Sequence, residues 1–191
     1  MDTEMLVVGL VILALIAIAL VLYQRKTRSK NLQHHFGAEY GRAVETTGSR
    51  DKAEAELLAR RKRVDQLHIA PLSPADAQRF TQAWRSLQAR FVDNPQDALA
   101  QADALVQDLM RTRGYPMGDF ERSAADISVN HPGVVEHYRA GHAIAERQGR
   151  GEVDTEGMRQ AVIHYRALFA ELLEVDQPEH HDHHPDMRTQ S

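Results

Sequence analysis

Apolar residues recur every three or four positions along most of this chain, which is the spacing of one face of an α-helix. Phe80, Trp84, Leu87 and Phe91, for example, follow one another at spacings of four, three and four. No stretch alternates with period two and also carries enough β-branched or aromatic residues to predict a strand. The pattern therefore predicts an all-α protein whose body is a bundle of about five to six helices.

Capping residues mark where these helices begin. SPAD (73–76) and NPQD (94–97) share one pattern, in which Ser or Asn caps the helix, proline takes the first helical position and Asp stands at the third. The capping and turn residues predict helices at about 31–46, 51–67, 74–91, 95–113 and 119–127, and two more that begin near Pro132 and Thr155.

The segment from Met5 to Tyr23 differs from the rest because it has no polar face. It reads MLVVGLVILALIAIALVLY, and its length as a helix is about 28 Å, close to the hydrocarbon thickness of a bilayer. A cleaved signal peptide would need a basic start and a small-x-small cleavage site, whereas this start carries Asp2 and Glu4 and no A-x-A follows. The sequence therefore predicts a transmembrane helix at 5–23.

The residues that flank this segment predict its orientation. Four basic residues follow it closely and none precedes it: Arg25, Lys26, Arg28 and Lys30. By the positive-inside rule, residues 1–4 are expected outside and the remainder in the cytoplasm, as in a single-pass protein of the bacterial inner membrane. A basic stem and juxtamembrane helix would occupy 24–50, a helical domain 51–175, and a disordered His-rich tail 176–191.

Composition narrows the classes of function. The chain has no cysteine, so it has no disulfide and no thiolate nucleophile, which fits a reducing compartment. The net charge is −4, and because the first 30 residues carry +2, the remainder carries −6. An acidic body argues against nucleic acid as the main partner. No Walker-type phosphate loop and no G-x-S-x-G element is present.

A nine-residue motif, V-x-H-Y-R-A-x-x-A, occurs twice, at 135–143 and 162–170. On a helical wheel each tyrosine, Tyr138 and Tyr165, lies on the apolar stripe, and the neighbouring His and Arg border it. We therefore interpret the motif as two helices with one packing pattern, joined by a polar network of the bordering residues. His142 occupies the position that Phe169 fills in the second copy.

Histidines are the only candidates for chemistry in the body. An enzyme is the alternative hypothesis, with His137, His142, His164 and Tyr138 as catalytic candidates beside His131, and Asp126 to orient them. This hypothesis requires that these side chains converge in one cleft.

The tail offers the only metal-ligand cluster in the sequence. Its histidines lie among acidic residues in EHHDHHPD: His180, His181, His183 and His184. A solvated low-complexity end that binds zinc or nickel adventitiously is one interpretation, and a dedicated metal site is the other.

Several stretches occur in an order that resembles a known group of proteins: FGAEYGRAVETTGSR, IAPLSP, W-x-x-x-Q-A-R-F-V-D-N-P, GYPMGDFERSAADISVNHP and the two HYRA segments. Over roughly residues 32–173 the chain resembles a family of small, uncharacterised bacterial proteins with one membrane segment and a helical cytoplasmic domain. The resemblance implies that architecture and no catalytic or binding residues. The leading hypothesis is a membrane-anchored, non-enzymatic interaction or scaffold protein, with the lipid bilayer and a protein partner or second copy as its contacts.

Overall fold

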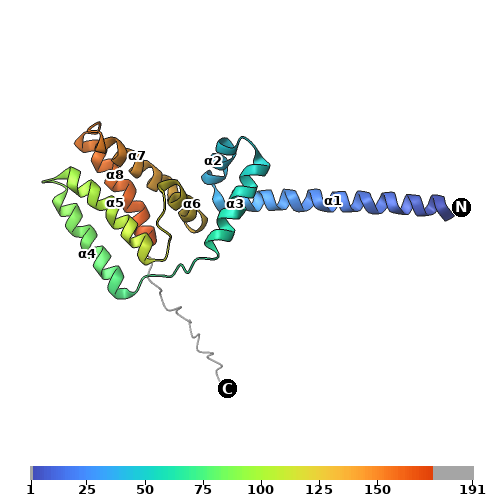
Figure 1. Ribbon diagram of the computed structural model, residues 1–191, viewed down its shortest axis with the longest axis horizontal. Coiled ribbons are helices and arrows are strands. Elements are labelled where there is room, and N and C mark those ends of the chain that lie inside the picture. Colours follow the sequence, from blue (N-terminus) through green and yellow to red (C-terminus); the bar gives the residue numbers. More distant parts are fainter. Residues whose placement is uncertain (1, 174–191) are drawn as a thin grey trace, which may run out of the picture. The chain divides into compact units, whose positions relative to one another are not determined.

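The computed structural model describes residues 2–173, without the side chains at 2–6, 9–11, 14 and 21. Its eight helices are α1 (Asp2–Phe36), α2 (Ala38–Thr47), α3 (Arg50–Val64), α4 (Pro74–Arg90), α5 (Pro95–Thr112), α6 (Phe120–Asn130), α7 (Val135–Gly149) and α8 (Thr155–Leu172) (Figure 1). The described residues contain no β-strand, so the all-α prediction is confirmed. The predicted tail at 176–191 lies outside the described residues.

The prediction of a transmembrane helix at 5–23 is wrong. Within residues 2–173, no helix is both long enough and apolar enough to cross a bilayer. Residues 5–23 are not a separate element but part of α1, which continues through the basic residues to Phe36. The predicted single-pass inner-membrane localisation depended on that helix and is corrected with it.

Side-chain caps explain the starts of α4, α5, α6 and α8. The Ser73 hydroxyl accepts a hydrogen bond from the Asp76 amide at 3.1 Å, and the Asn94 side chain accepts one from the Asp97 amide at 3.2 Å. These bonds satisfy amide donors that the first turn of a helix leaves without partners. Both predicted capping patterns are therefore confirmed.

The predicted helix at 31–46 has the wrong start, because residue 31 lies inside α1. Residues 24–30 contain no glycine or proline that would interrupt α1, so the helix continues to Phe36. The break comes at Gly37, whose φ of 51° lies in a region that disfavours side chains. α2 then ends at Gly48, which has a left-handed conformation, as the sequence predicted.

The chain forms two compact units. The first comprises the chain up to Leu67 together with Tyr115–Ala140, and thus contains α1, α2, α3, α6 and the first residues of α7. Its core includes the fully buried side chains of Phe36, Leu57 and Ile127.

The second unit comprises His68–Gly114 and the chain from Gly141, and contains α4, α5, the rest of α7 and α8. α5 packs against both α4 and α8 (Figure 1). In its core the rings of Trp84 and Phe169 stack with centroids 4.5 Å apart. The buried Tyr165 donates a hydrogen bond to Asp103 at 2.8 Å.

Candidate anion-binding cleft

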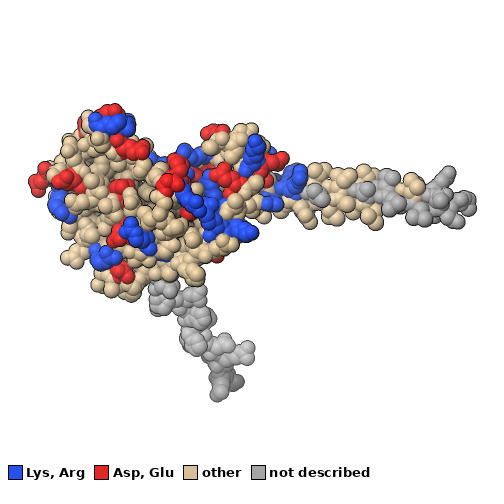
Figure 2. Space-filling model, viewed as in Figure 1, with Lys and Arg blue, Asp and Glu red and all other residues tan. Residues whose placement is uncertain are grey.

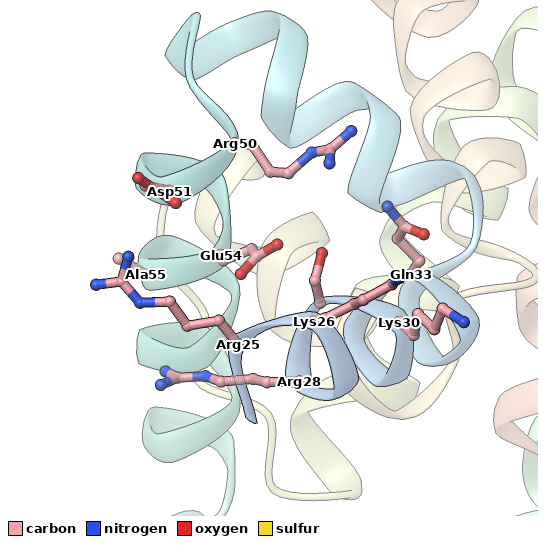
Figure 3. A pocket seen from close by; sticks show the side chains of 10 residues that line it. Arg25, Lys26, Arg28, Lys30, Gln33, Arg50, Asp51, Glu54 and Ala55 are labelled. Atoms are coloured by element: carbon pink, nitrogen blue, oxygen red, sulfur yellow. The ribbon is translucent and has the colours of Figure 1, made fainter. Parts of the chain in front are cut away.

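The first unit carries a cleft of about 640 Å³ between the C-terminal half of α1 and the beginning of α3 (Figure 3). Because Gly37 ends α1, the chain can fold back through α2, so that α3 contacts α1. Figure 2 shows Lys and Arg side chains, with Asp and Glu among them, over the region where α1 lies beside α2 and α3.

The cleft is strongly basic. Five of the side chains that line it are cationic: Arg25, Lys26, Arg28, Lys30 and Arg50. Two are acidic, Asp51 and Glu54, so the lining has a formal charge of +3 at neutral pH. None of the five cations has an ion-pair partner among the described residues.

One of the acidic side chains is held in place by the fold. The hydroxyl of the buried Tyr40 donates a hydrogen bond to Glu54 at 2.8 Å and lies 3.4 Å from the hydroxyl of Ser29. Figure 3 shows Glu54 projecting from α3 into the cleft, while Arg25 and Arg28 extend from α1 toward α3. The cleft therefore combines one fixed carboxylate with several unneutralised donors, and such donors bind carboxylate or phosphate groups.

The same unit also contains a buried ionic cluster. Arg139 donates hydrogen bonds to both carboxylate oxygens of Glu39, at 3.2 and 3.3 Å, and to Glu121 at 2.7 Å. Arg60 also binds Glu39, at 3.2 Å. Burial alone would raise the pKa of Glu39, but the hydrogen bonds and charge of Arg139, together with Arg60, hold it below its ordinary value. The members of this cluster bind one another, so we interpret it as structural.

The candidate catalytic residues belong to both units. In the first unit Tyr138 is buried, with its ring 4.9 Å from that of Phe120, and His137 is exposed. The Asp126 carboxylate, expected to orient a histidine, accepts a hydrogen bond from Arg63 Nε at 2.8 Å.

In the second unit His142 is half-buried, with Nδ1 4.0 Å from a Glu146 oxygen, and His164 is half-buried on α8. None of His137, Tyr138, His142 and His164 lines the basic cleft.

The duplicated motif is confirmed for its tyrosines, and its two arginines differ in burial. Tyr138 and Tyr165 are buried, as the helical wheel predicted. Arg139, expected to border the apolar stripe, is itself buried and binds Glu39 of α2 and Glu121 of α6. In the second copy, Arg166 is exposed.

The metal candidates of the tail, His180, His181, His183 and His184, lie outside the described residues. Within residues 2–173, no group of three or more His, Asp or Glu side chains is arranged to hold a metal ion.

The basic cleft was missed by the sequence reasoning. The residues from Arg25 to Lys30 were interpreted only as an orientation signal, although no acidic residue lies between Met5 and Ala38 to neutralise them. Comparison with known protein families, characterised proteins and solved structures gives no match, so the family resemblance stays a prediction.

Proposed function

We propose that this chain is a protein-interaction module whose basic cleft binds an acidic segment of a partner protein. The observation that carries the proposal is the set of five cationic side chains in one cleft that have no ion-pair partner among the described residues. Unneutralised charges that face solvent attract a partner of opposite charge and increase the rate of association.

Two features favour an acidic protein segment over a nucleic acid. The cleft contains Asp51 and Glu54, and their charges would repel a continuous line of phosphates while leaving room for scattered carboxylates. Its lining has no aromatic side chain on which a base could stack, and the whole chain has a net charge of −4.

Fluorescence anisotropy of the full chain with a labelled, flexible peptide of alternating Glu and Ser tests the proposal. We expect saturable binding that weakens as ionic strength rises. The variant Arg25→Gln/Arg28→Gln/Arg50→Gln should raise Kd by about tenfold or more, because it removes three of the five cations.

The matched control removes three exposed arginines elsewhere: Arg90→Gln/Arg111→Gln/Arg147→Gln. Both variants change the net charge equally, so equal losses of affinity would mean a non-specific charge effect and would refute the proposal. Tighter binding of an oligonucleotide of the same charge through the same cleft would also refute it. Sedimentation equilibrium distinguishes a separate partner from a second copy of this chain. If the partner is a second copy, the original chain is a dimer and the cleft variant should dissociate into monomers.

A further inference from the structure

A second groove lies on the second unit, along one face of α4 and beside α8. On α4 its lining residues run from Pro74 to Gln88, which corresponds to about 21 Å of helix and four turns. On α8 the lining continues through Arg166 and Phe169 to Leu173. Its two parts measure about 660 and 330 Å³ and share Thr81, Arg85 and Leu173, so they form one elongated groove.

The narrower part of this groove has an aromatic base. The stacked rings of Trp84 and Phe169 line it, and each side chain is only 5% exposed. The indole Nε1 of Trp84 is buried and has no hydrogen-bond acceptor among the described residues. Buried indole donors usually have a partner, so this unpaired donor is an exception within the second unit.

The charge of the groove indicates the chemistry of its occupant. Arg85 of α4 and Arg166 of α8 are exposed, come from the two helices that border the groove, and have no ion-pair partner among the described residues. The described lining contains no carboxylate, although acidic residues outnumber basic ones in the chain by 27 to 23. An occupant with negative charge is therefore complementary.

We propose that this groove binds an amphipathic, acidic helix of a partner protein. The length of four turns suits a helix laid along α4, with apolar side chains over Trp84 and Phe169 and carboxylates paired with Arg85 and Arg166. The site is separate from the basic cleft and needs no residue of it, so the two proposals can fail independently.

Trp84 makes the test direct because it is the only tryptophan of the chain. The probe is a synthetic helix of about 14 residues, to match four turns, with Leu at spacings of three and four and Glu beside them. Titration into the full chain should shift Trp84 emission with saturation. A matched peptide with Gln in place of every Glu should bind about tenfold more weakly, because its charge is lost.

Variants locate the binding. Arg85→Gln/Arg166→Gln should weaken binding of the Glu peptide about tenfold and leave the Gln peptide almost unchanged. The control Arg79→Gln/Arg90→Gln removes two charges of α4 that do not line the groove, and the Arg25→Gln/Arg28→Gln/Arg50→Gln variant tests the basic cleft. In both variants the Glu peptide should shift Trp84 emission as it does in the original chain, because this signal reports the groove and not the basic cleft. Equal affinity for the two peptides, or an equal loss in the control variants, would overturn the proposal.

The chain's own acidic tail is the competing occupant. A full chain with its tail carboxylates neutralised addresses this: Glu174→Gln, Asp176→Asn, Glu179→Gln, Asp182→Asn and Asp186→Asn. We expect its affinity for the Glu peptide to match that of the original chain. A chain that binds the peptide only after this neutralisation would identify the tail as the occupant and refute a separate partner.

Discussion

The guanidinium of Arg139 binds both carboxylate oxygens of Glu39, which precedes it by 100 positions in the sequence. Both side chains are buried, at 9% and 1% exposure. The pair joins α2 to the first turns of α7 within the first unit, and Arg60 and Glu121 extend it to α3 and α6.

Arg139→Met should destabilise the protein by about 3 kcal/mol, because it leaves the buried Glu39 carboxylate with Arg60 alone. Urea denaturation at neutral pH measures the change. The control is Arg159→Met, which removes an exposed arginine paired only with its helix neighbour Glu156 and should have no measurable effect. Similar midpoints for the original chain and Arg139→Met would contradict a structural role for the cluster.

Glu39 should make the stability depend on pH at the acidic end. Its pKa is held below the ordinary 4.5, so the unfolded chain takes up a proton there more readily than the folded one. The stabilisation from Glu39 is therefore present above about pH 4.5 and is lost as the pH falls through the lower pKa of the folded state. Glu39→Gln should flatten this acidic limb in urea midpoints measured across pH.

Glu136 should behave in the opposite way and provides the comparison for Glu39. Burial and the neighbouring Glu39 raise its pKa, so its charged form opposes folding at neutral pH. Glu136→Gln is expected to raise the urea midpoint at pH 7 and to leave the acidic limb of Glu39 in place. A lower urea midpoint for Glu136→Gln at pH 7 would contradict this expectation. It would show that the attraction of Glu136 to Arg139 outweighs its repulsion from Glu39.

Gly114 should tolerate no side chain. Its φ is 96°, and a Cβ there would lie 2.4 Å from the His68 carbonyl oxygen. Gly114→Ala should therefore cost about 2 kcal/mol or more, from backbone strain together with the clash. Gly149→Ala is the matched control, since nothing lies within 4 Å of its added Cβ and no positive φ strains it. Thermal denaturation should separate the two variants clearly.

His142 and Phe169 occupy equivalent positions in the two copies of the motif, and exchanging each for the other residue should change the stability by unequal amounts. Phe169→His should destabilise by about 3 kcal/mol, because it removes the ring stacked on Trp84 and buries an imidazole in its place. His142→Phe should change stability by less than about 1 kcal/mol, because His142 is only half-buried. Urea denaturation of both variants tests the comparison, and equal losses would contradict the burial difference.

Features that depend on neighbouring residues could be predicted from the sequence, and features that depend on distant ones could not. The caps at Ser73 and Asn94 were predictable because each side chain binds an amide three residues later. The burial of Tyr165 followed from helical periodicity.

The site required information that no local pattern contains. The burial of Arg139 depends on Glu39, and the basic cleft depends on the turn at Gly37 that allows α3 to contact α1. The membrane prediction failed because composition alone assigned residues 5–23 a separate helix, whereas they are part of the longer α1.

The distance in sequence between Glu39 and Arg139 has a consequence for synthesis of the chain. A ribosome needs about 5 to 20 seconds to add the 100 residues that separate them, so α1, α2 and α3 leave it long before the arginine exists. During that interval the Glu39 carboxylate has Arg60 of α3 but not Arg139 to bind, while the nascent α4–α5 hairpin can already form from local contacts. The helices α1, α2 and α3 are thus synthesised first, but their packing is completed among the last. A chaperone that binds nascent chains would find exposed protein surface on these helices.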